Sequence, residues 1–140
     1  TMMDYLSIVV ATAAAFAVGA LWYGPLFGRR WRLLMNFSEG HMGAQEGAAT
    51  GQGMPMASAM VGGFIATFFL VFALNFLMEA FSIMTLSGAV AISLLASLGF
   101  IATTMANGVF YERRTWGLYF INTSHYIVAL IVASLVLLYI

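Results

Sequence analysis

The sequence has 140 residues, of which 63% are hydrophobic and only 7% are charged, and its formal net charge is zero. Soluble domains carry about 25% charged residues, so this chain has too few charges to be a soluble enzyme, a disordered tail or a nucleic-acid binder. Cysteine is absent, which excludes disulfides, thiolate zinc sites and iron–sulfur clusters.

Four long stretches without a charged residue predict four membrane spans. They cover residues 5–28, 47–78, 80–111 and 115–140, and each exceeds the roughly 18 residues of a transmembrane candidate. We expect helices over about 5–23, 58–79, 86–110 and 116–140. The predicted fold class is therefore all-α: a polytopic membrane protein that forms one four-transmembrane-helix bundle over residues 1–140.

The first span is expected to be a retained helix rather than a signal peptide. The preceding residues Thr1–Asp4 contain no Lys or Arg, whereas a signal peptide begins with a positively charged region. Small residues on one face of this helix lead to two aromatic residues at the membrane boundary: Ala11, Thr12, Ala15, Gly19, Trp22 and Tyr23. Aromatic side chains at such a boundary are typical interfacial anchors.

The loop 24–57 is expected to have two parts. Pro25 suits the first position of a helix, and apolar residues after it recur at helical spacing with arginines between them: Phe27, Trp31, Leu34, Arg29, Arg30 and Arg32. This pattern predicts a short basic amphipathic helix over about 25–36 that lies among lipid headgroups. The glycine-rich residues 38–57 predict a flexible linker.

The methionines of this region are soft side chains that could bind Cu(I) together with His41: Met42, Met54, Met56 and Met60. Methionine is also ordinary apolar filler in a chain of this composition. We therefore expect no metal site and no cofactor here.

The distribution of arginines predicts the orientation in the membrane. All five cations fall in the loops 24–57 and 111–115, and none falls on the side of the two termini: Arg29, Arg30, Arg32, Arg113 and Arg114. Cytoplasmic loops carry an excess of Lys and Arg, so both termini are expected to be extracytoplasmic. A functional interpretation of the same arginines is a docking site for anionic lipid headgroups.

The second and third helices are joined by a short connection and are expected to pack as an antiparallel hairpin. The second helix has a stripe of small residues and, nearly opposite, an aromatic stripe: Ala59, Gly62, Ala66 and Ala73, against Phe64, Phe68, Phe72 and Asn75. In lipid, helices associate through small residues and interhelical hydrogen bonds. Two such faces indicate partners on both sides, including another subunit.

Polar residues of the third and fourth helices are predicted to converge in the cytoplasmic half of the bundle. At 100° per residue, the third helix gathers small and polar residues on one arc: Ala89, Ser93, Ala96, Ser97, Thr103, Thr104, Asn107 and Tyr111. The fourth helix places Asn122, His125, Ala129 and Ala133 on one face. The resulting polar intramembrane cluster comprises Thr103, Thr104, Asn107, Asn122 and His125.

His125 has two interpretations. In the first, it has a structural role and forms an interhelical hydrogen bond with a neighbour such as Asn107. In the second, it is a functional group in a proton relay, a substrate contact or a ligand of a haem or pigment. The structural role is the preferred interpretation, because burial of a neutral histidine costs less free energy than burial of a charged group. The other histidine, His41, lies in the linker.

Two sequence boxes resemble a known family. They are Ala20–Gly28 (ALWYGPLFG) followed by Trp31, and Glu112–Trp116 (ERRTW) followed by Asn122. They are similar to the DUF1761 family of small bacterial integral membrane proteins, a domain of unknown function. The resemblance implies a polytopic protein of the bacterial inner membrane and implies no reaction.

The sequence therefore predicts a membrane protein that is not an enzyme. It has no phosphate-binding loop, no metalloprotease pair and no nucleophile–base motif, while Asp4 and Glu79 lie on the side opposite His125. We expect it to act through helix packing in the lipid bilayer, with itself or with other membrane subunits. The alternatives are a small transporter or proton-coupled permease around His125, and a haem- or pigment-binding subunit.

Overall fold

The computed structural model describes residues 5–31, 33 and 56–140, and these residues are helical apart from short turns. The elements are α1 (Tyr5–Leu21), the π-helical segment η1 (Trp22–Leu26), α4 (Met56–Ala80), α5 (Leu86–Ala96), the π-helical segment η2 (Ser97–Ala102), α6 (Thr103–Tyr111) and α7 (Trp116–Tyr139). Segments α5, η2 and α6 follow one another without a break and form the third long helix.

Four helices are long and apolar enough to cross a membrane: Tyr5–Leu26, Ala57–Ala80, Leu86–Tyr111 and Trp116–Tyr139. The described residues contain no strand. The predicted fold class, an all-helical protein with four long apolar helices, is confirmed.

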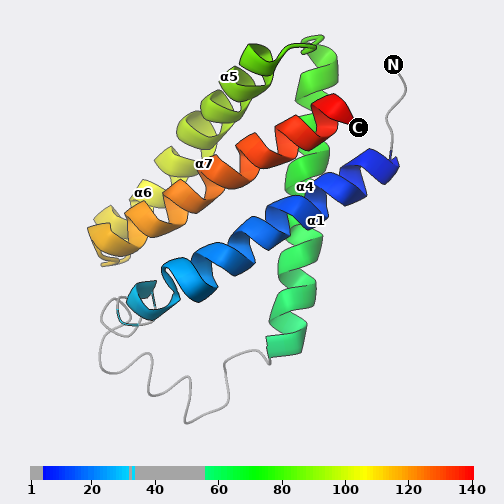
Figure 1. Ribbon diagram of the computed structural model, residues 1–140. Coiled ribbons are helices and arrows are strands. Elements are labelled where there is room, and N and C mark those ends of the chain that lie inside the picture. Colours follow the sequence, from blue (N-terminus) through cyan, green and yellow to red (C-terminus); the bar gives the residue numbers. More distant parts are fainter. Residues whose placement is uncertain (1–4, 32, 34–55) are drawn as a thin grey trace.

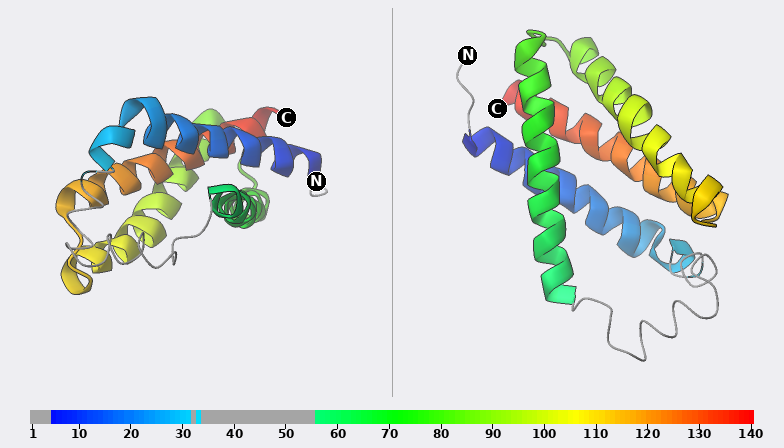
Figure 2. Two further views of the ribbon diagram at one scale, coloured as in Figure 1. Left: turned by 90° about the horizontal axis from the view of Figure 1, so that it is seen from below. Right: turned by 180° about the vertical axis from the view of Figure 1, so that it is seen from behind.

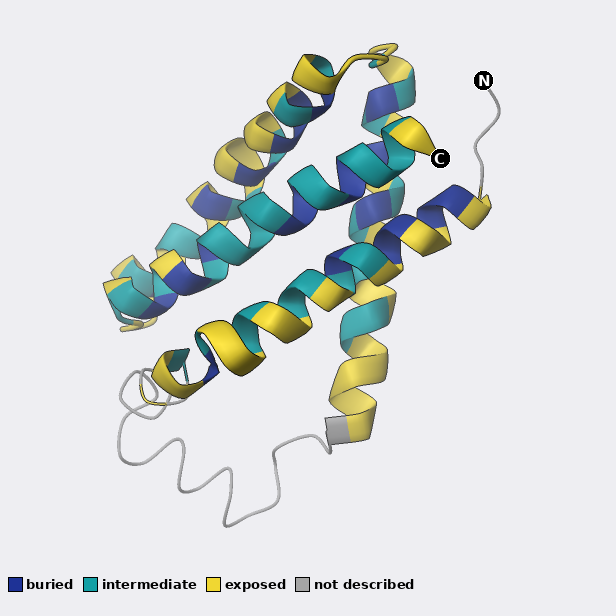
Figure 3. Ribbon diagram, viewed as in Figure 1, coloured by how far each residue is buried: buried dark blue, intermediate teal, exposed yellow. Residues whose placement is uncertain are grey.

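Three of the four helices lie side by side, and α4 crosses them obliquely (Figures 1 and 2). The most extensive contact joins α1 to α7, followed by α5 with α7 and α1 with α4. The first half of α4 leaves the other helices and is exposed on all sides near its start (Figure 3).

The expected hairpin of the second and third helices is limited to its turn. The amide of Ile83 donates to the carbonyl of Met78 at 2.8 Å, and the hydroxyl of Thr85 accepts from the amide of Gly88 at 3.0 Å, which caps α5. Beyond this turn α4 and α5 diverge (Figure 1), and α5 packs more extensively on α7 than on α4. The prediction of a packed hairpin is therefore wrong beyond the turn, because the cohesive contacts of α5 lie on α7.

The path after α1 also differs from the prediction. Pro25 does not begin a new helix but lies inside η1, which continues α1. The amide of Phe27 donates to the carbonyl of Trp22 at 2.9 Å, a five-residue step that passes over the missing N–H of Pro25. Residues 28–31 and 33 are helical, while Arg32, His41, Met42, Met54 and most of the predicted linker lie outside the described residues.

The centre of the molecule consists of small and branched side chains of four helices: Ile8, Ala11, Ala15, Val71, Leu74, Ala89, Ile92, Ala129, Leu130 and Ala133. The hydroxyl of Ser93 is fully buried and donates to the carbonyl of Leu130 at 3.0 Å, which joins α5 to α7. The predicted buried faces of the first and fourth helices are confirmed by the burial of Ala11, Ala15 and Ala129.

A leucine at Ser93 is expected to destabilise the protein. The side chain of Ser93 has no exposed surface, so a larger side chain should lower the free energy of unfolding by about 1–3 kcal/mol. Unfolding is measured by titrating the protein in mixed micelles with sodium dodecyl sulfate and following the helix content by circular dichroism. Ala91→Leu is the control on the exposed face of the same helix. Equal losses of stability at the two positions would show that the α5–α7 contact is not tight.

Candidate functional site

The end of α1 is attached to the first turns of α7 by two aromatic side chains. The indole Nε1 of Trp22 donates to the carbonyl of Ile121 at 3.0 Å, and the hydroxyl of Tyr23 donates to Oδ1 of Asn122 at 2.5 Å. Both bonds connect residues 99 positions apart in the chain. The aromatic residues predicted as interfacial anchors are therefore also the hydrogen-bonding partners of α7.

His125 packs one turn beyond this attachment, against a glycine of α1. Its Nε2 lies 3.1 Å from the position that a Cβ on Gly19 would occupy. The rings of Tyr23 and Tyr126 flank it, with centroids at 5.1 and 4.8 Å. Within the described residues, the buried Nδ1 of His125 has no hydrogen-bond partner. Gly19 thus gives the imidazole its space, and the aromatic rings enclose it.

Three members of the predicted polar cluster do not join this site. Thr103, Thr104 and Asn107 are exposed, so their convergence with Asn122 and His125 was predicted wrongly. The hydroxyl of Thr103 donates to the carbonyl of Gly99 at 2.7 Å, within its own helix. The observed site is therefore formed by α1, η1 and α7 alone among the described elements.

The π-helical segment η2 is the physical reason for this error. A turn closed by i→i+5 hydrogen bonds holds more residues than the 3.6 of an α-helical turn, so the residues after it are rotated relative to those before it. Ser93 and Ser97 are buried before and at the start of η2, as predicted. Ala102, the last residue of η2, and Gly108, in α6, are the next residues to be buried. The assumption of a uniform rotation of 100° per residue therefore assigns Thr103, Thr104 and Asn107 to the wrong face of the helix.

The sequence reasoning missed two residues that the site depends on. Gly19 lies on the predicted small face of the first helix, but the pattern does not identify its contact with His125. Its position four residues before Tyr23, on the same side of the helix, is the signal that could have found it. Tyr126 was not considered, because nothing in its spacing separates it from ordinary apolar residues.

The arginines lie at the same end of the molecule as this site. Arg29, Arg30, Arg113 and Arg114 are all exposed. Trp31 is half-buried, with its ring centroid 5.4 Å from that of Tyr23. Within the described residues, no group of three or more His, Asp or Glu side chains is placed to hold a metal ion.

The comparison with protein families agrees with the boxes in the sequence. The profile of the family described as "Protein of unknown function (DUF1761)" matches residues 6–138. No curated protein and no solved structure matches the chain.

Substitution of Gly19 by valine is expected to destabilise the protein through His125. The added side chain would meet Nε2, and overpacking of this kind costs about 1–3 kcal/mol. A second change, His125→Ala, should recover most of that loss, which an unfolding titration of the two single variants and the double variant can measure.

Gly63→Val is the matched control, since a Cβ on Gly63 would make only an ordinary contact with Phe16, at 3.6 Å. Additive losses in the Gly19 and His125 double variant would contradict the contact between these residues.

Proposed function

This chain belongs to the DUF1761 family, and on that premise we propose that it is a non-enzymatic membrane protein that associates with a second copy of itself through one face of α4. The family carries no assigned activity, so the proposal rests on the geometry of the chain. In lipid, the burial of apolar surface gives no driving force between helices, and association depends on close packing of small residues.

The observation that carries the proposal is the exposure of the first half of α4. Only 17% of the apolar window of this span is buried, against 28–33% in the other three. Residues 57–62 are all exposed, while the aromatic stripe that includes Phe64 and Phe68 turns towards the rest of the chain. Among the described residues, the face of α4 that has no intramolecular partner therefore includes its small residues.

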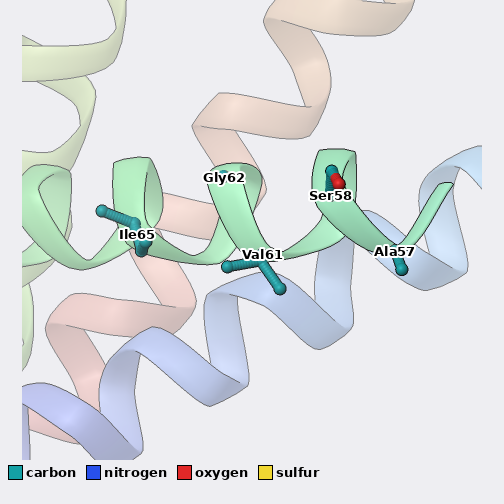
Figure 4. A pocket seen from close by; sticks show the side chains of 5 residues that line it. All are labelled: Ala57, Ser58, Val61, Gly62 and Ile65. Atoms are coloured by element: carbon teal, nitrogen blue, oxygen red, sulfur yellow. The ribbon is translucent and has the colours of Figure 1, made fainter. Parts of the chain in front are cut away.

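The exposed face has a shallow groove beside a ridge. Ser58, Gly62 and Ala66 follow one another at intervals of four residues and are all exposed. Beside them run Val61 and Ile65, and an open depression is lined by Ala57, Ser58, Val61, Gly62 and Ile65 (Figure 4). A Cβ on Gly62 would meet no atom within 4 Å, so no described part of the chain fills this space.

Such a face is complementary to itself. Small residues four apart let two helix backbones approach closely in the right-handed crossing of small-xxx-small pairs. Val61 and Ile65 are β-branched and hold one preferred rotamer in a helix, so they lose little conformational entropy when they pack against the partner. A two-fold symmetric dimer places the ridge of each copy beside the groove of the other.

The absence of cysteine from the chain permits a direct test by cross-linking. Ser58→Cys in membranes should form a disulfide-linked dimer on mild oxidation, because a disulfide requires Cα atoms within about 7 Å. Adding Gly62→Leu should reduce the dimer about tenfold or more, since overpacking costs about 1–3 kcal/mol.

Ala91→Cys, on the exposed face of α5, is the matched control and should stay monomeric. Equal cross-linking at positions 58 and 91, insensitivity to Gly62→Leu, or a cross-linked product with the mass of a different protein would each contradict self-association.

A second candidate function, a small transporter, has one observation in its favour. The buried Nδ1 of His125 has no partner within the described residues, and an ionisable group inside a span suggests function by default. Four helices are few for alternating access, so this function too would require a dimer. The transporter function is favoured over a purely structural role of His125 if His125→Ala abolishes transport while expression and the free energy of unfolding stay unchanged.

We also infer that the arginine-bearing end is cytoplasmic, since cytoplasmic loops carry the excess of arginine. In intact cells, a membrane-impermeant maleimide should label Ser82→Cys, in the turn between α4 and α5, from outside. Glu112→Cys, in the turn between α6 and α7, should react only after permeabilisation. Both residues are exposed. The opposite labelling pattern would reverse the orientation.

A further inference from the structure

The described cations form one basic end of the molecule. This basic end consists of Arg29 and Arg30, which follow η1, and Arg113 and Arg114, between α6 and α7; the two pairs lie at the same end of the helices (Figures 1 and 2). Glu112 is the one carboxylate described there. At the opposite end, the charged group among the described residues is Glu79.

The two arginine pairs are tied to the same helix. The hydrogen bond from Tyr23 to Asn122 and the ring contact between Tyr23 and Trp31 dock the residues after η1 on α7. Asn122 lies seven residues after Thr115, the N-cap of α7, which is about 10 Å along the axis. Both pairs therefore lie at the end of the molecule where α7 begins (Figure 1).

The backbone of the α6–α7 turn presents Arg113 in an unusual way. Its φ is 59°, in the left-handed region that glycine usually occupies after a helix. The amide of Arg114 donates to the carbonyl of Gly108 at 3.0 Å and closes the turn. Arg113, just after α6, is therefore an exposed arginine at a backbone position that glycine would fit better.

Arg114 is positioned by the glycine beneath it. A Cβ on Gly108 would lie 3.0 Å from Cδ of Arg114 and 3.5 Å from Oε2 of Glu112. The missing side chain lets the stem of Arg114 lie across the end of α6. Arg114 is therefore held against the end of α6, next to the exposed Arg113.

From this arrangement we propose that the basic end binds the phosphate headgroup of an anionic phospholipid. All cations of the chain are arginine and none is lysine, and the planar guanidinium pairs with phosphate through two parallel hydrogen bonds. Trp31 and Trp116 are close in sequence to the two arginine pairs, and indole rings are enriched among lipid headgroups. The site needs two arginine pairs, far apart in the sequence, that the folded chain brings to one end of the molecule.

Native mass spectrometry of the purified protein tests the proposal. The protein is released from mixed micelles that contain equal amounts of phosphatidylglycerol and phosphatidylcholine. The wild-type chain should retain phosphatidylglycerol in preference to phosphatidylcholine. Changing Arg113 and Arg114 together to Gln should lower that preference by roughly tenfold or more, as expected for two charges near an anionic surface.

Three further variants separate binding from structure. Arg113→Gly suits the left-handed backbone and should fold normally yet lose lipid preference, whereas Arg113→Lys should retain part of it. Glu79→Gln, at the opposite end, should change nothing. Circular dichroism of each variant confirms that the helices are formed.

Equal retention of the two lipids by the wild-type chain would overturn the proposal, as would an undiminished preference after all four arginines are changed to Gln. Displacement of bound phosphatidylglycerol by millimolar inorganic phosphate would identify free phosphate, and not a lipid, as the ligand of the site.

Discussion

The fold depends on one constraint: in a bilayer, apolar side chains gain little by leaving lipid for protein, so cohesion must come from close packing and from interhelical hydrogen bonds. The structure concentrates both on α7. Small residues of α1 and α5 are buried against it, and hydrogen bonds reach it from Trp22, Tyr23 and Ser93. From α7 itself, the hydroxyl of Tyr119 donates to the carbonyl of Ala102 at 3.0 Å and so joins α7 to η2.

This dependence on α7 explains why α4 is different. Its second half contributes Val71, Leu74 and Met78 to the buried centre, but its first half carries the small face outwards. A helix that crosses the others obliquely can touch them over only part of its length (Figure 1). The exposed part holds small residues of the kind that membrane helices use to approach one another, and this supports the proposed pairing with a second copy of the chain.

The fold class could be predicted because charge-free stretches are a strong signal for membrane spans. Local spacing also identified the buried faces of the first and fourth helices, where the helix is regular. It failed for Thr103, Thr104 and Asn107 because the π-helical segment before them changes the rotation per residue, and no pattern in the residues announces that change. The partners of Trp22 and Tyr23 are 99 residues away and could not be found from local spacing.

The polar site and the basic end share one origin in the chain. The Trp22–Leu26 segment continues α1, and its first two side chains form hydrogen bonds with α7. It therefore positions both the contact with His125 and the arginines that follow. The proposed self-association uses a different helix, α4. We propose that the functional unit contains two chains.

The most direct test is the stoichiometry of the wild-type chain in lipid vesicles over a range of protein-to-lipid ratios. It is measured by counting the photobleaching steps of single particles, with one fluorophore attached to each chain. Two steps in most particles are predicted, with a return to one step as the protein-to-lipid ratio falls. One step at every density would contradict the account.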